Sequence, residues 1–276
     1  MLSDEQCIFW DKKGLFVFLY DTCASYSNNI KHYQALSSST ESSEQKDAFE
    51  VVQSLYDIEP LWVPVVYSDK NLHFWEAACS WMQQEDATDT WKIWIQLRKC
   101  FLKKNKLYFL YQKSEVLAHE YVHACRYSLH AKRYEEFFAY YTSFYFANKS
   151  PTAYLRGFLG PLFSSPKEAQ YFLLSLVVPS CALILDPFFS DPFFSEILFC
   201  LPFLACALFG TRLLWRWKKW YRCKKKISLP LMVRLTDEEI EFFSTLSQEK
   251  IIAWIGEARK TSFRWQELCL IYCNKL

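Results

Sequence analysis

The feature that most constrains the fold of this chain is a nearly uncharged run from Tyr171 to Trp215. Its only charged residues are Asp186, Asp191, Glu196 and Arg212. Two apolar segments, 171–185 and 197–211, flank the acidic, aromatic link DPFFSDPFFSE. Each is shorter than the roughly 20 residues that usually span a bilayer, but aromatic flanks and snorkelling arginines can lengthen a span. We therefore predict a two-helix membrane hairpin; a re-entrant or interfacial hairpin and two buried helices of a soluble fold are the alternatives.

The charges beside this hairpin predict its orientation. Eight lysines and arginines lie between Arg212 and Lys226, whereas the link between the two segments has three acidic residues and no basic one. Because basic residues favour the cytoplasmic side, we expect an integral membrane protein whose N-terminal and C-terminal parts both face the cytoplasm. The lipid bilayer is then a partner. The basic run also suits anionic lipid, although a plain stop-transfer flank explains it as well.

The composition argues against several other classes of protein. The net charge is +2, so nothing in the overall charge indicates a nucleic-acid partner. Glycine is scarce and no phosphate-loop pattern is present, which disfavours a nucleotide-binding fold. Eleven cysteines, an odd number without a C-x-x-C pair, fit reduced cytosolic thiols better than a secreted disulfide scaffold.

The residues on either side of the uncharged run have the patterns of folded structure. After residue 226 we expect three short amphipathic helices, the first with Thr236 and Glu239 spaced as a capping box. Before the run, alternating and helical apolar periods predict a mixed domain. Its expected strands are 14–20, 61–67, 91–97 and 107–111, and its expected helices are 48–58, 71–82, 114–126 with Ser114 as N-cap, and 134–148.

The stretch VLAHEYVHAC carries the clearest chemical pattern. His119 and His123 are four residues apart, with Glu120 directly after the first histidine. Residues i and i+4 share one face of a helix, so both imidazoles can bind one zinc ion. Glu120 is rotated by about 100°, where its carboxylate can act as general base toward a water that zinc activates. The uncharged neighbours of the motif favour a buried metal site over a chance match on a surface helix.

These residues resemble the active-site helix of the zincin metallopeptidases, and the resemblance covers roughly residues 90–145. It implies zinc, peptide-bond hydrolysis, and an upstream hairpin or edge strand that grips the substrate, the place that 91–97 and 107–111 occupy. The gluzincin branch takes its third ligand from a glutamate in an E-x-x-A sequence on the next helix. Glu136 matches this spacing, and Glu135 is the alternative ligand. Tyr140 stands where that branch usually has an aspartate, so the surroundings of the metal must differ.

Three further residues near the motif are weaker candidates. Tyr134, Tyr140 and His130 could stabilise an oxyanion or hydrogen-bond a metal ligand. For the tyrosines, packing in an aromatic helix is the bland alternative. For His130 the alternative is an ordinary position at a helix end.

We therefore predict an α+β chain with three regions. A zincin-like domain over 1–167 combines a small sheet with the active-site helix and the glutamate helix. A membrane hairpin with its basic, aromatic flank covers 168–226, and an all-α appendage covers 227–276. The predicted function is a membrane-anchored metalloprotease that uses Zn2+ to hydrolyse a peptide or protein, including one in the membrane. A non-catalytic membrane adaptor with a structural or degenerate HExxH site, and a zinc hydrolase of another substrate, stay open.

Overall fold

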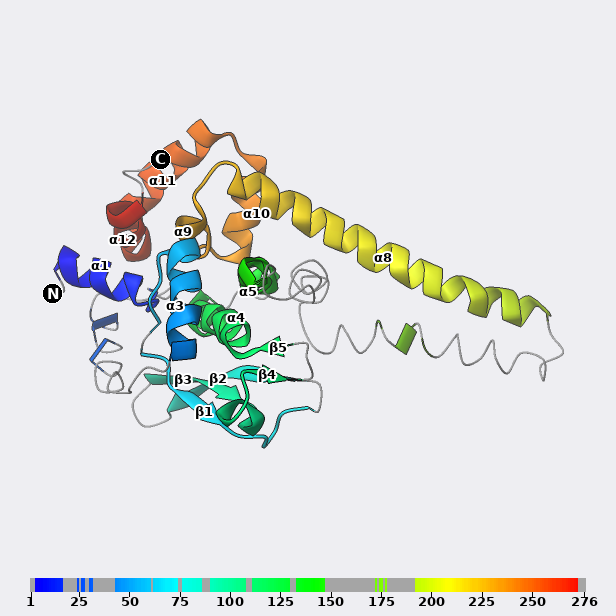
Figure 1. Cartoon of the computed structure of the whole chain (residues 1–276). Coiled ribbons are helices and arrows are strands. Elements are labelled where there is room, and N and C mark those ends of the chain that lie inside the picture. The colour runs from blue at the N-terminus through cyan, green and yellow to red at the C-terminus, as the bar shows by residue number, and fades with distance from the viewer. Residues whose placement is uncertain are drawn as a thin grey trace.

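The structure is a computed structural model, and most of its described residues are helical, with strands that form a small sheet (Figure 1). This is the mixed α+β architecture that the sequence predicts. The structure describes residues 3–16, 24, 26–27, 30–31, 43–60, 62–73, 76–85, 90–107, 111–129, 133–146, 172, 174–175, 177 and 192–272.

The three-stranded sheet has the order β1-β3-β2. The central strand β3 (Thr90–Leu97) is parallel to β1 (Val65–Tyr67) and antiparallel to β2 (Ala78–Glu85). The apolar residues that alternate along β3 are buried, as the sequence pattern predicts; they are Ile93, Ile95 and Leu97. Because β2 is the last strand in this order, it is an edge strand within the described sheet.

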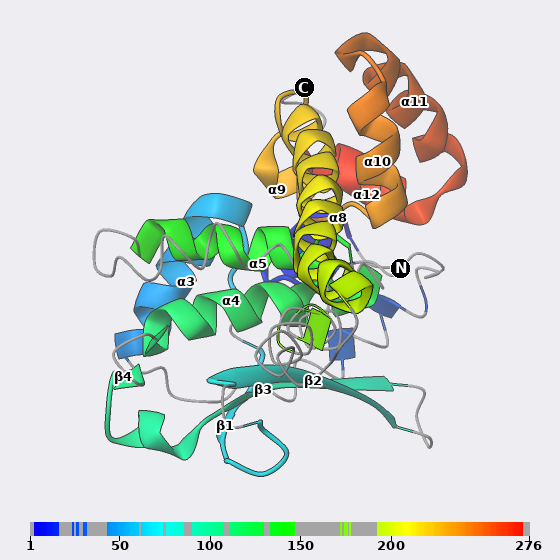
Figure 2. The ribbon, with the colours of Figure 1, turned by 90° about the vertical axis from the view of Figure 1, so that its right-hand side faces the viewer.

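The helix α4 (Lys113–Arg126) lies at the centre of the fold. Figure 2 shows it between the sheet on one side and the helices α3 (Ser43–Tyr56) and α5 (Glu135–Ser143) on the other. Most side chains of α4 are buried because it packs on both sides. The short strands around it are β4 (Lys106–Leu107) and β5 (Tyr111–Gln112), and the short 3-10 helices are η1 (Lys99–Leu102), η2 (Tyr127–Leu129) and η3 (Phe144–Phe146).

The C-terminal helices fold back onto the N-terminal part of the chain. A long helix, α8 (Pro192–Lys224), projects from the body in Figure 1. It is followed by α9 (Leu229–Met232), α10 (Asp237–Thr245), α11 (Gln248–Thr261) and α12 (Phe263–Tyr272). α10 contacts α8, α9 contacts α3, and α12 contacts α1 (Asp4–Lys12). The capping box of Thr236 and Glu239 is confirmed, and it opens α10.

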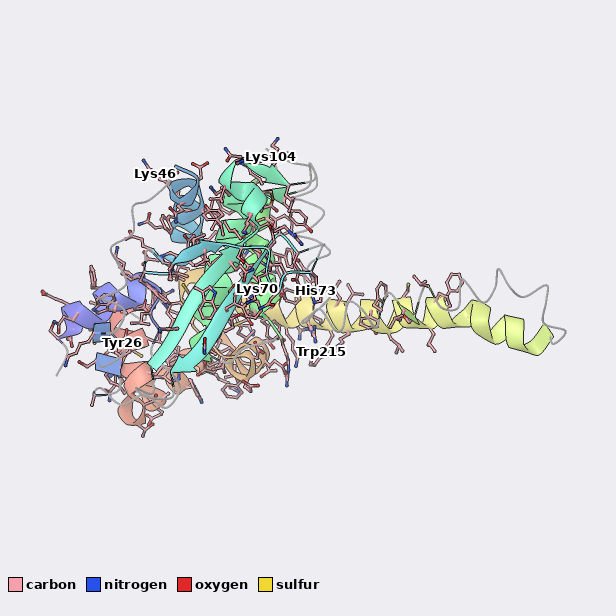
Figure 3. The ribbon with its side chains drawn as sticks, turned by 90° about the horizontal axis from the view of Figure 1, so that it is seen from below. Tyr26, Lys46, Lys70, His73, Lys104 and Trp215 are labelled. Atoms are coloured by element: carbon pink, nitrogen blue, oxygen red, sulfur yellow. The ribbon has the colours of Figure 1, made fainter. Side chains whose placement is uncertain are left out.

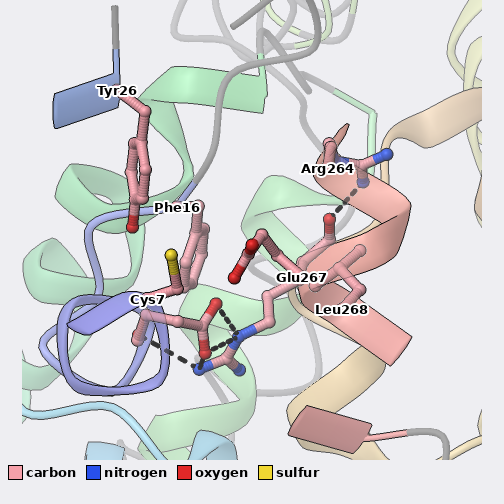
Figure 4. A pocket seen from close by; sticks show the side chains of 8 residues that line it. Cys7, Phe16, Tyr26, Arg264, Glu267 and Leu268 are labelled. Carbon is pink, nitrogen blue, oxygen red and sulfur yellow. Dashed lines mark hydrogen bonds and ion pairs between the residues drawn. The ribbon is translucent and has the colours of Figure 1, made fainter. Parts of the chain in front are cut away.

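A buried ion pair joins the two ends of the chain. The Arg234 guanidinium lies 2.8 Å from the Asp11 carboxylate, which also accepts a hydrogen bond of 2.8 Å from the Tyr272 hydroxyl. All three side chains are buried, so loss of one partner would cost about 3–5 kcal/mol. Figure 4 shows the cavity beside the pair; its volume of about 10 Å³ holds no more than one water molecule.

The predicted boundaries of the three regions stay predictions.

Several predicted elements differ from the observed ones. The predicted helix 71–82 is wrong, because residues 78–85 form β2 and pair with β3 along its whole length. Of the predicted strand 107–111, the end residues Leu107 and Tyr111 pair with each other in β4 and β5, and residues 108–110 lie outside the described residues. α4 begins at Lys113 with Gln112 as its N-cap, so Ser114 lies inside the first turn. Of the predicted strand 14–20, residues 14–16 are not in a strand and the rest lies outside the described residues.

The predicted membrane hairpin is also not found. In the part of the chain that the structure describes, no helix has both the length and the apolarity to cross a membrane. The second predicted segment, 197–211, lies within α8, which continues past Pro202 into the basic run. The first segment, 171–185, lies outside the described residues apart from positions 172, 174, 175 and 177.

Candidate metal centre

The candidate metal centre lies between α4 and α5. His119 and His123 are one helical turn apart on α4, so their rings face the same way. Glu136 is in the first turn of α5, which packs beside α4. All three side chains are partly buried, with exposed fractions between 13% and 23%. The two helices therefore bring the three predicted ligands together at the surface of the core.

The distances among these ligands fit a single ion. The Nε2 atoms of His119 and His123 are 3.0 Å apart. The two carboxylate oxygens of Glu136 lie 3.8 Å from the first Nε2 and 3.7 Å from the second. Zinc bonds of 2.0–2.1 Å in tetrahedral geometry separate two ligand atoms by about 3.3 Å. The observed distances bracket this value, so His119, His123 and Glu136 form a group that can hold a metal ion.

Glu135 lies outside this group and has a different partner. Its Oε1 is 2.9 Å from Nδ1 of His123, the ring nitrogen that faces away from the other ligands. When Nδ1–H donates to this carboxylate, the neutral ring offers the lone pair of Nε2 to a metal. Glu135, the alternative ligand in the sequence prediction, thus orients the imidazole ring of His123.

The electrostatics of the group favour a bound cation. Burial by itself lowers the pKa of His123, but the carboxylates of Glu136 and Glu135 outweigh it and raise this pKa to about 10. Burial raises the pKa of Glu136 to about 7, although the nearby His123 acts in the opposite direction. Partly buried carboxylates around two imidazoles are stabilised by positive charge, which a proton or a metal ion can supply.

Glu120 lies on a different side of α4, toward the sheet. Its carboxylate is buried and accepts a hydrogen bond from the hydroxyl of Ser80, in the edge strand β2. Burial raises the pKa of Glu120, while the charge of His123 and the hydrogen bond from Ser80 act to lower it. Glu120 is thus close enough to interact electrostatically with His123 without belonging to the ligand group. Ser80 was missed because its segment had the pattern of a helix.

The tyrosines near the motif have distinct environments. The Tyr140 ring packs edge-on against the His119 ring, with 4.5 Å between their centroids. Tyr134 is fully buried, and burial, followed by the charges of Glu241 and Asp237 in α10, raises the pKa of its hydroxyl. None of these causes involves the metal group. His130 lies outside the described residues.

A residue of α10 positions the start of the glutamate helix. The Asp237 carboxylate accepts hydrogen bonds from the backbone N–H of Arg133, at 2.6 Å, and of Tyr134, at 3.2 Å. These two residues directly precede α5, whose N-cap Tyr134 has no side-chain cap of its own. Asp237 therefore holds the backbone that leads into α5 from another part of the chain. A link over such a sequence separation leaves no local pattern, so sequence reasoning missed it.

The described fold and its ligand group define an α+β protein with a candidate metal centre. No protein-family model, curated protein or solved structure matches the chain. The resemblance to zincins therefore depends on the HExxH motif, the E-x-x-A spacing and the geometry of His119, His123 and Glu136.

Proposed function

We propose that this chain is a zinc-dependent peptidase in which His119, His123 and Glu136 hold the metal and Glu120 is the general base. The convergence of the three ligand atoms carries the proposal. Two imidazoles and one carboxylate are a donor set that catalytic zinc sites use, and they leave one position open. Hydrolysis also requires a general base, and Glu120 is a further carboxylate close enough to interact with the charge of His123.

Each chain residue has a defined task in the proposed reaction. Zinc, when bound, polarises a carbonyl and makes water a better nucleophile. Glu120 takes the proton of the attacking water and returns it to the leaving amine. The hydroxyl of Ser80 fixes the orientation of that carboxylate, and Glu135 fixes the ring of His123. These contacts hold the groups in place before substrate arrives, which is where positioning contributes to rate.

A peptide is the substrate that the surroundings favour. β2 lies at an edge of the described sheet and contacts α4, and its residue Ser80 touches the general base. An edge strand offers backbone donors and acceptors to an extended chain. An extended peptide that pairs with β2 would pass beside Glu120 and the metal ligands.

Metal analysis and hydrolysis of a peptide library by the same purified samples test this proposal. We expect one zinc per chain in the wild type and its loss in His119→Ala. Glu120→Gln is expected to keep the zinc and lose hydrolysis, since it removes the base and no ligand. His73→Ala is the matched control, because this histidine lies outside the ligand group. Zinc without hydrolysis in the wild type would favour a structural metal, and zinc that survives His119→Ala and His123→Ala would refute the site.

A further inference from the structure

The long helix α8 has two halves with different surroundings. In its second half Arg216, Trp220 and Cys223 are buried and share one face, which packs on the body. Trp220 lies with its ring centroid 5.4 Å from that of Tyr141 and stacks near Phe137 of α5. Between positions 202 and 215, by contrast, no side chain is buried. Figures 1 and 3 show this first half projecting away from the body.

A second face of α8 is exposed along both halves and changes character along its length. Its members follow one another at helical spacings of three, four and seven residues, which places them on one side of the helix. We call this the outward stripe; it consists of Leu204, Leu208, Trp215, Lys218, Arg222 and, one residue past the helix, Lys225. Leu204, Leu208 and Trp215 are 55%, 61% and 51% exposed. The stripe thus runs from apolar side chains through a tryptophan to exposed basic ones.

We propose that the outward stripe lies on the surface of an anionic lipid bilayer. The leucines would enter the acyl boundary, Trp215 would take the headgroup level that tryptophan prefers, and the basic residues would meet lipid phosphates. This contact requires no helix that crosses the bilayer, and it does not involve the metal centre. Leu204 and Lys225 are separated by about 30 Å along the helix, long enough to use the whole stripe at once.

A second copy of the chain fits this stripe less well than lipid does. Parallel pairing of two stripes would place basic ends on basic ends. Antiparallel pairing would place the basic residues of one copy on the leucines of the other. A lipid monolayer has an apolar acyl layer beside a layer of negative headgroups. The acyl layer complements the leucines of the stripe, and the headgroups complement its basic residues.

Flotation of the purified full chain with vesicles tests the lipid proposal. We expect binding to vesicles that contain phosphatidylglycerol and much weaker binding to pure phosphatidylcholine. Each basic residue near an anionic surface changes affinity about fivefold, so the triple variant Lys218→Gln, Arg222→Gln, Lys225→Gln should bind about a hundredfold more weakly. The double variant Leu204→Asp, Leu208→Asp should stay out of the floating fraction.

Matched variants on the body serve as controls. Lys103, Lys104 and Lys106 are exposed on the body away from α8, where Figure 3 shows Lys104, and their replacement by glutamine should change binding little. Leu102→Asp with Ile252→Asp matches the leucine pair, since both residues are exposed. Circular dichroism checks that every variant is folded. Equal losses in control and stripe variants would overturn the proposal. Absence of flotation would also overturn it. A dimer in light scattering that becomes monomeric only in the Leu204→Asp, Leu208→Asp variant would overturn it as well, in favour of a second copy of the chain.

Discussion

Replacing Glu135 and Glu136 separately by glutamine distinguishes a ligand from the residue that positions a ligand. Glu136 has both oxygens toward the histidine Nε2 atoms, whereas Glu135 contacts Nδ1 of His123 at 2.9 Å. Both changes neutralise one partly buried carboxylate and preserve its size. A difference in zinc affinity between the two variants therefore reports position and not charge alone.

The size of that difference follows from the distances to the ion. A ligand oxygen lies about 2 Å from zinc. The Glu135 oxygen lies roughly 7 Å away, once the zinc–nitrogen bond, the ring and the 2.9 Å hydrogen bond are added. Coulomb attraction falls with distance, so the direct ligand contributes about three times the free energy. Loss of a partner such as Glu135 weakens metal binding about 10–100-fold. Three times the free energy of a tenfold loss corresponds to about a thousandfold, so we expect Glu136→Gln to weaken zinc binding at least about a thousandfold.

Competition with a fluorescent zinc chelator measures both affinities. Glu135→Gln keeps an oxygen that can accept from Nδ1–H, so we expect a loss near tenfold, with Glu135→Ala nearer a hundredfold. Glu257→Gln, an exposed glutamate on α11 that pairs with Lys260, is the neutralisation control. If Glu135→Gln lost more zinc affinity than Glu136→Gln, the ligand assignment would be reversed. If it matched the control, Glu135 would have no role in the site.

Three further changes test contacts around the site and its central helix, and a fourth, in α11, is a comparison in open space. Asp237→Ala removes the carboxylate nearest to the fully buried Arg126 and is expected to cost about 3–5 kcal/mol in the free energy of unfolding, measured with denaturant; an effect below 1 kcal/mol, roughly that of a surface pair, would contradict this. Ser80→Ala should keep full zinc content but lower kcat about tenfold, because it frees Glu120, the proposed general base, from its hydrogen bond; zinc loss would assign Ser80 to the metal. Gly14→Ala should lower Tm and cost about 1–3 kcal/mol, since φ is +84° and its Cβ would lie 2.5–2.7 Å from neighbouring side chains. Gly256→Ala, with open space around it in α11, should instead stabilise by about 0.5–1 kcal/mol.

The metal group could be predicted from the sequence because it depends on local geometry. Helical periodicity alone puts His119 and His123 on one face. The choice of Glu136 over Glu135 came from the resemblance to gluzincins, through the E-x-x-A spacing, and the structure places Glu136 in the first turn of α5 beside the histidines. The same local rules predicted the capping box of α10 and the buried face of β3 correctly.

The contacts that support the metal group could not be predicted in this way. Ser80 reaches Glu120 only because residues 78–85 form a ladder with β3, and that pairing overrides a local pattern that suggested a helix. Asp237 holds the backbone before α5 over a long sequence separation. Such contacts depend on how the chain folds back on itself, and no spacing along the sequence encodes them.

The central position of α4 accounts for the uncharged residues around the HExxH motif without a metal. Its uncharged residues pack against the sheet on one side and against α3 and α5 on the other. Cys125 lies so close to the left-handed turn at Gly14 that a Cβ there would be 2.5 Å from its sulfur. A central helix would need those uncharged residues with or without a metal, so they are weak evidence for one. The polar residues that the helix keeps are stronger evidence. Burying His119, Glu120 and His123 costs free energy unless each has a partner, and one cation between α4 and α5 would satisfy the histidines together with Glu136.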